Sequence, residues 1–148
     1  MNIIINRTYL FFFLTILLIL AFAFYNPKGT FSVNIYDTYY VILNSHLGIL
    51  LSIIYFIPGI IYFVLHKKGI FLNNWIIYLH TIISIGGLIF VWFLLQKINI
   101  PPPQPFDEII KSIKINMYLT YTYIATIVSM VLIQIIFMIN VVFTILKN

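Results

Sequence analysis

The sequence predicts an all-α integral membrane protein, built as a bundle of four transmembrane helices in one membrane domain, residues 1–148. Of its 148 residues, 63% are hydrophobic and only 7% are charged, whereas a soluble domain is about half apolar and a quarter charged. The apolar residues gather in runs long enough to cross a hydrocarbon core of about 30 Å as helices. Too few charges remain to cover a water-facing surface, which excludes a soluble enzyme.

Charge, proline or asparagine bounds each predicted span. The first covers about residues 8–25 and ends before Asn26-Pro27. We favour an uncleaved helix here, although Ala21-Phe22-Ala23 has the small-x-small form of a signal-peptide cleavage site. The other three spans cover about residues 38–66, 72–96 and 116–146.

A loop over residues 97–115 is predicted to join the third and fourth spans. It contains Pro101-Pro102-Pro103-Gln104-Pro105, which favours an extended polyproline II segment. A short amphipathic helix is predicted to follow at the headgroup boundary. In it, isoleucines alternate with Asp107, Glu108, Lys111 and Lys114.

An even number of spans places both termini on the same side of the membrane. Lysine and arginine divide equally between the two sides, so the positive-inside rule does not choose between them. We favour termini on the cytoplasmic or matrix side. Lys67 and Lys68 adjoin their helix on that side, while the long third loop also carries Asp107 and Glu108.

The entry to the second span is unusually polar for a segment that starts in lipid. Its residues Asp37-Thr38-Tyr39-Tyr40-Val41 resemble the start of the tenth helix in the catalytic subunit, subunit I, of haem-copper oxidases. The family pattern there is His-Asp-Thr-Tyr-Tyr-Val-Val-Ala-His-x-His. A fainter similarity to the eleventh helix involves Leu79-His80 and Ile85-Gly86. The resemblance implies that the four spans correspond to helices nine to twelve, with Asp37 on the outer side.

In that family, the two histidines that end the motif are axial ligands, the first to the high-spin haem and the second to the low-spin haem. Aligned on Asp37 to Val41, the first position holds Asn44 and the second holds His46. The resemblance therefore implies His46 as a candidate ligand of a low-spin haem, without an oxygen-reducing haem at Asn44. Tyr36 replaces a histidine that helps to hold magnesium in the family, which leaves Asp37 as a candidate remnant of that metal site. No catalytic residue and no complete metal site are expected.

The histidines also have simpler interpretations. His46 can be a neutral imidazole that hydrogen-bonds across a helix interface. At 1.5 Å per residue, it lies about 9 Å above the centre of its span, and His80 lies roughly 7 Å below the centre of the next, so the two do not share one haem. His66 adjoins Lys67 at the membrane surface and is assigned no role.

Three stripes of small or polar side chains predict close helix packing rather than a transport path. They consist of Asn44, Gly48 and Ser52; of His80, Ser84 and Gly87; and of Thr122, Thr126 and Ser129.

The function expected from these features is that of a non-catalytic accessory or interaction protein of a respiratory membrane, without a cofactor. Its partners would be the lipid bilayer and oxidase or other membrane subunits, in the bacterial cytoplasmic membrane or, alternatively, the mitochondrial inner membrane. One alternative is a haem-binding protein that uses His46, with the second ligand supplied by a homo-oligomer or a partner subunit. Another is an unrelated transporter or channel subunit. Nucleic acid is excluded as a partner because the sequence contains no basic stripe.

Overall fold

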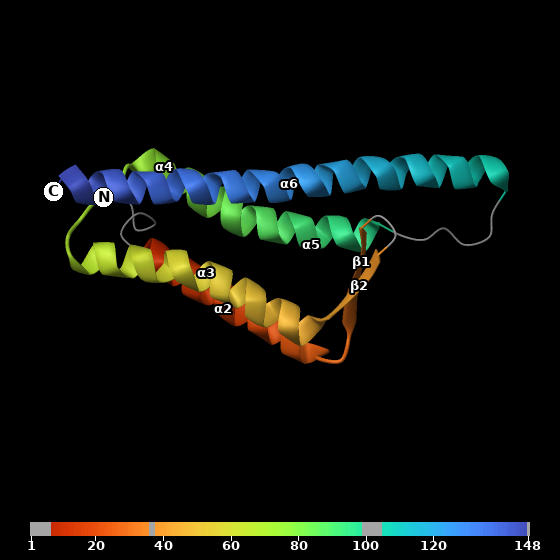
Figure 1. Ribbon diagram of the computed structural model, residues 1–148, viewed down its shortest axis with the longest axis horizontal. Coiled ribbons are helices and arrows are strands. Elements are labelled where there is room, and N and C mark those ends of the chain that lie inside the picture. The colour runs from red at the N-terminus through yellow and green to blue at the C-terminus, as the bar shows by residue number, and fades with distance from the viewer. Residues whose placement is uncertain (1–6, 36–37, 99–104, 148) are drawn as a thin grey trace. The chain divides into compact units, whose positions relative to one another are not determined.

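The computed structural model describes residues 7–35, 38–98 and 105–147, and its chain divides into two units, Met1–Phe71 and Leu72–Asn148. The first unit holds α2 (Thr8–Tyr25), β1 (Thr30–Ile35), β2 (Thr38–Leu43) and α3 (Asn44–Lys67) (Figure 1). The second unit holds α4 (Asn74–Thr81), the π-helix η1 (Ile82–Gly86), α5 (Gly87–Lys97) and α6 (Phe106–Lys147). Because α4, η1 and α5 follow one another without a break, the described residues contain 4 helical stretches that are long and apolar enough to cross a membrane.

In the first unit, α2 and α3 run antiparallel and pack along their lengths (Figure 1). The ring of Phe12 is fully buried and lies 6.0 Å from the ring of Tyr55 and 5.6 Å from that of Tyr62. Near the other end of the pair, a Cβ added at Gly48 would overlap the side chain of Ala23. The two backbones approach closely here because residue 48 has no side chain.

A β-hairpin connects these two helices. β1 and β2 pair antiparallel, from Thr30 opposite Leu43 to Ile35 opposite Thr38. The prediction of a helix over residues 38–66 is therefore wrong for the 6 residues of β2, and α3 begins only at Asn44. The strand Thr-Tyr-Tyr-Val-Ile-Leu consists of β-branched, aromatic and apolar residues, which favour a pleated strand once a pairing partner is adjacent.

In the second unit, the continuous helix Asn74–Lys97 runs antiparallel to α6 (Figure 1). Asn73 directly precedes this helix, and its side chain accepts a hydrogen bond of 3.0 Å from the Trp75 amide, which caps the first turn. Further along, a Cβ at Gly87 would lie 2.8 Å from Cγ of Met130, so α5 and α6 are in close contact at this point. The buried apolar side chains of the unit are Leu72, Ile77, Leu94, Ile133, Phe137 and Val141.

The last helix is longer than predicted. Residues 107–115 do not form a separate interfacial helix, because α6 is one helix of 42 residues from Phe106 to Lys147. This stretch contains no proline or glycine that would interrupt it. Asp107 and Glu108 lie in its first turn, where a negative charge stabilises the positive end of the helix dipole. Residues 101–104 of the predicted polyproline segment lie outside the described residues.

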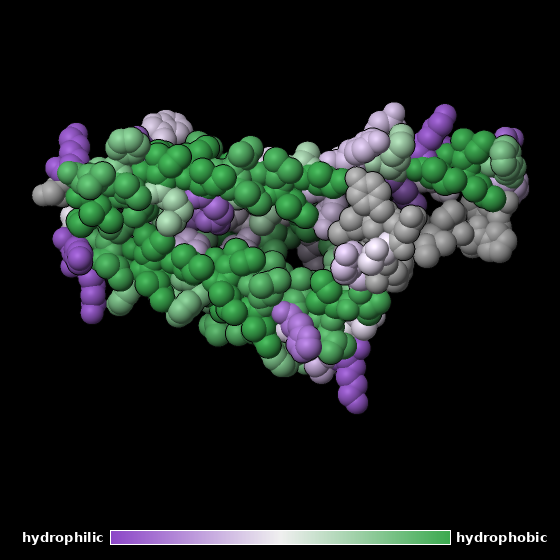
Figure 2. All heavy atoms as spheres, viewed as in Figure 1, coloured by the Kyte–Doolittle hydropathy of each residue, from purple (hydrophilic) through white to green (hydrophobic). Residues whose placement is uncertain are grey.

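Hydrophobic side chains cover the helices on the face shown in Figure 2, and hydrophilic ones gather near the helix ends. Many large apolar residues are exposed on every long helix, for example Leu17 on α2, Ile57 on α3 and Ile135 on α6. A lipid environment accommodates such a surface, because the backbone polar groups of a helix are satisfied internally.

Candidate functional site

A buried polar cluster joins α4 and η1 to α6. Nε2 of His80 donates a hydrogen bond of 3.0 Å to Oε1 of Gln134, and Nε2 of Gln134 donates one of 3.3 Å to Oγ of Ser84. The ring of Phe137 stacks on the imidazole, with centroids 4.2 Å apart and planes inclined by 10°. We call these four residues the His80 cluster. Since the amide oxygen of Gln134 can only accept, Nε2 of His80 carries a proton in this arrangement.

Simple helical periodicity positions each member of the cluster. His80 lies near the end of α4 and Ser84 in η1, four residues later, so both side chains reach the same neighbour on α6. Gln134 and Phe137 are three residues apart on α6 and share one face. The π-helix lies beside these contacts, and π-helical turns occur often at functional positions.

His80 and Ser84 are both 0% exposed. A buried polar group without a partner is costly, and here each side chain finds one on the facing helix. The cluster can therefore fasten the two helices of the unit together. The prediction that His80, Ser84 and Gly87 share a packing face is confirmed, because Gly87 contacts Met130 and Thr126 on the same helix, α6.

Gln134 is the residue that sequence reasoning missed. The fourth predicted span offered no motif, yet a glutamine near the middle of an apolar run is itself a signal. A polar side chain at that depth is expensive and requires a partner. Which residue partners it depends on how the two helices align along their lengths, and the local sequence does not determine that alignment.

A second set of polar contacts joins the two ends of the hairpin segment, where α2 ends and α3 begins. Nδ2 of Asn44 donates a hydrogen bond of 3.3 Å to the carbonyl oxygen of Asn26, and its backbone amide donates one of 2.8 Å to that of Gly29. Oγ of Ser45 donates a third, of 3.3 Å, to the carbonyl of Pro27. Asn44 therefore ties the end of α2 to the start of α3, although the resemblance aligns it with a haem ligand.

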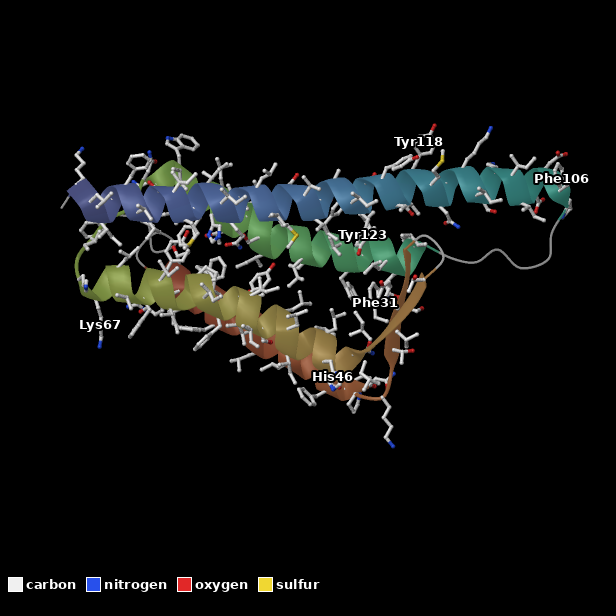
Figure 3. The ribbon with its side chains drawn as sticks, in the orientation of Figure 1. Phe31, His46, Lys67, Phe106, Tyr118 and Tyr123 are labelled. Atoms are coloured by element: carbon white, nitrogen blue, oxygen red, sulfur yellow. The ribbon has the colours of Figure 1, made fainter. Side chains whose placement is uncertain are left out.

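His46 lies at the hairpin end of α3, and Lys67 lies at the opposite end (Figure 3). The imidazole is exposed. It projects from the helix two residues after Asn44, about 200° further around the axis. His46 belongs to the first unit and His80 to the second.

The remaining motif residues differ in what the structure shows of them. Asp37 and Tyr36 lie outside the described residues. Thr38, Tyr40 and Val41 form part of strand β2. The resemblance had implied that they begin a helix. In the described part of the chain, no group of three or more histidine, aspartate or glutamate side chains could hold a metal ion.

The structure also describes the surroundings of His66 and of the hydroxyl residues of the fourth predicted span. His66 is exposed, and its ring lies 5.5 Å from that of Tyr9. The Thr122, Thr126 and Ser129 hydroxyls each donate to a carbonyl four residues earlier in α6. Thr126 lies at the contact with Gly87, while Thr122 and Ser129 are exposed.

No protein family, curated protein or solved structure matches this chain.

Proposed function

We propose that this chain is a non-catalytic integral membrane protein that assembles with oxidase or other subunits of a respiratory membrane. The observation that carries the proposal is the hydrogen bond of Asn44 to Asn26. The side chain at the first ligand position of the oxidase-like motif serves to hold the hairpin to the helices. The chain retains the motif residues Asp37 to Val41, but Asn44 makes a structural hydrogen bond at the position of the haem ligand. This combination fits an accessory or interaction role.

The buried and exposed surfaces support the same proposal. Gln134 binds the side chains of His80 and Ser84, so the polar groups of the His80 cluster serve to connect helices. Exposed apolar side chains on all four membrane-length helices leave extensive surface for lipid and for neighbouring helices. We place both termini on the cytoplasmic or matrix side, and the protein in the bacterial cytoplasmic membrane, with the mitochondrial inner membrane as the alternative.

Affinity purification of the full chain from its native membrane in mild detergent tests this function. We expect respiratory subunits to be enriched over a preparation made with an unrelated tagged four-helix protein. The His46→Ala variant should bring down the same subunits, since the assembly role does not use this imidazole as a ligand. Purification of the chain without any respiratory subunit would contradict the proposal.

A second candidate function is supported by the exposure of His46. In the described part of the chain, no hydrogen bond, ion pair or ring contact occupies this imidazole. It could ligate one low-spin haem, with the second ligand from another chain, for electron transfer or haem handling. The aligned position of Asn44 does not fit a ligand, because its amide nitrogen is bound to Asn26.

Absorption spectra of the oxidised and dithionite-reduced protein distinguish the two functions. A Soret band that disappears in His46→Ala and persists in His66→Ala would establish the haem-binding function. The pair is matched, because both histidines are exposed and lie on the same helix, near opposite ends. A preparation without stoichiometric haem would leave the assembly function.

A further inference from the structure

One end of the α2–α3 pair carries a group of basic side chains. Arg7 directly precedes α2, His66 and Lys67 lie in the last turn of α3, and Lys68 is the next residue. The two helix ends lie at the same level, because the ring of Tyr9 is 5.5 Å from that of His66. We call Arg7, His66, Lys67 and Lys68 the basic end of the first unit. All four of these residues are exposed.

The backbone itself closes this end of α3. The Lys68 amide donates a hydrogen bond to the carbonyl of Val64, and the Ile70 amide donates one to that of Leu65. Between them, Gly69 has a φ of 68°, the left-handed conformation in which many helices end. Because main-chain amides satisfy these carbonyls, the helix end does not need the lysine side chains as caps.

An aromatic ring helps to position one of the cations. Nζ of Lys67 lies 5.3 Å from the centroid of the Phe63 ring, and the ring of Tyr9 on α2 lies 5.5 Å from the same ring. Figure 3 shows the side chain of Lys67 projecting from the end of the helix. Phe63 thus contacts both the facing helix and the ammonium group, which keeps this charge at the end of the helix pair.

The positive charge of the basic end has no acidic counterpart nearby. Asp37 is the single acidic residue of the first unit, and in the sequence it lies between β1 and β2. The partial charges of the two helix ends oppose each other, since α2 begins here and α3 ends here. The side chains therefore determine the sign of the potential, and an anion complements it.

This combination differs from the other basic positions in the described parts of the chain. Three lysines are single ones near helix ends, and two share a helix segment with acidic residues: Lys28, Lys97 and Lys147 are the single ones, and Lys111 and Lys114 follow Asp107 and Glu108.

Apolar surface directly adjoins the basic end. Leu10 on α2 and Phe63 and Val64 on α3 are exposed and lie within one turn of Arg7 or Lys67. Both helices continue from here as apolar segments of membrane length. A free phosphate ion would contact the cations alone. A phospholipid places its phosphate beside the cations and its acyl chains along the apolar helices, so it is the better complement to this surface.

We infer that the basic end binds the headgroup phosphate of an anionic phospholipid. The guanidinium of Arg7 can donate two parallel hydrogen bonds to one phosphate. The ammonium groups of Lys67 and Lys68 add charge, and the imidazole of His66 supplies an N–H donor. This binding site goes beyond the proposed assembly function, which does not require it.

Native mass spectrometry of the full chain with two lipids tests the site. Dioleoyl phosphatidylglycerol and dioleoyl phosphatidylcholine have the same acyl chains and differ in net charge. We expect the first to bind at least tenfold more tightly. Lys67→Gln should weaken its binding about fivefold, the contribution of one basic residue near an anionic membrane surface. Lys67→Arg should retain the binding, because it keeps the charge.

Lys97→Gln is the matched control. Lys97 also lies in the last turn of its helix, and its Nζ is 5.4 Å from the ring of Phe93, four residues earlier. The control therefore removes the same charge and the same kind of ring contact, but at a single lysine, and phosphatidylglycerol binding should change less than twofold. Equal losses in Lys67→Gln and Lys97→Gln would overturn the inference.

A double variant and a soluble competitor complete the test. Arg7→Gln combined with Lys67→Gln should lower phosphatidylglycerol binding at least tenfold, with circular dichroism to check that the helices are retained. Unchanged binding in this variant, or equal binding of the two lipids to the unmodified chain, would overturn the inference. So would full competition by an equal concentration of glycerophosphoglycerol, the headgroup without acyl chains, because it would indicate a site for free anions. None of these results depends on which respiratory subunits copurify.

Discussion

Nε2 of His80 and Oε1 of Gln134 lie 3.0 Å apart, although the two residues are 54 positions apart in the sequence. This hydrogen bond links α4 to α6, and the stacked ring of Phe137 shields one side of it. Ser84 extends the link into η1 through the amide nitrogen of the same glutamine. One side chain on α6 thus fixes two successive segments of the facing helix.

The first prediction concerns the strength of this link. Gln134→Leu should lower the free energy of unfolding by about 1–3 kcal/mol, because it removes the hydrogen bonds of Gln134 to the buried side chains of His80 and Ser84. Unfolding by sodium dodecyl sulfate in mixed micelles measures this. Gln96→Leu, at an exposed glutamine near the end of α5, is the control and should change stability little.

A double-mutant cycle with His80→Phe then isolates the pairwise contribution. We expect a coupling energy of about 0.6–2 kcal/mol between positions 80 and 134, the range found for hydrogen bonds between membrane helices. Additive effects of the two substitutions would show that the hydrogen bond does not contribute to stability.

Two adjacent glycines provide a test of the contact between α5 and α6. Gly87→Leu should destabilise the protein by about 1–3 kcal/mol, because the new side chain enters the space of Met130. Gly86→Leu should be neutral or stabilising, since a Cβ there meets no atom within 4 Å and leucine favours a helix more than glycine does. Thermal unfolding in detergent compares the two, and equal effects would contradict the packing described.

The hairpin should depend on the asparagine at its base. Asn44→Ala removes the hydrogen bond to the Asn26 carbonyl, worth about 1 kcal/mol, so amide exchange within Thr30–Leu43 should rise about fivefold. Hydrogen–deuterium exchange with mass spectrometry reports this segment by segment. Asn74→Ala, in the second unit, should leave exchange in the hairpin unchanged. An equal rise in both variants would argue against a specific role for Asn44.

The position of the membrane along α6 can be mapped by labelling. A membrane-impermeant maleimide should react with Ser112→Cys and not with Ser129→Cys. Tyr118 and Tyr121, both exposed, are of the residue type that favours a membrane boundary, and residue 112 precedes them while residue 129 follows them. Exposure within the protein alone predicts the reverse order, since Ser129 is exposed and Ser112 is half-buried. Faster labelling at position 129 would contradict the assigned boundary.

Hydrophobic patterning predicted the helices better than it predicted their ends. The first span agrees with α2 at both ends, because Arg7 precedes the apolar run and Asn26-Pro27 follows it. The second span was started too early because an apolar segment long enough for a helix can also contain a strand. The alternation of polar and apolar residues over Thr30–Ile35 was the signal for its pairing partner.

The sequence predicted only the α4 and η1 side of the His80 cluster, and not its partner on α6. The spacing of His80, Ser84 and Gly87 indicated their common face, since a helix repeats every 3.6 residues. Gln134 could not be assigned to them, because its partners depend on the alignment of two helices. The length of α6 was underestimated for a related reason. Charged residues suggested an end to the span, but charged residues do not by themselves end a helix.

The uninterrupted backbone of α6 makes it a mechanical link between its first turns and the His80 cluster. Gln134 lies 28 residues after Phe106, about 42 Å along the axis, with no proline or glycine between them to absorb a twist. A rotation imposed on the first turns is therefore transmitted to the amide that holds His80. A partner that turned the first turns of α6 would therefore also act on the hydrogen bond between His80 and Gln134.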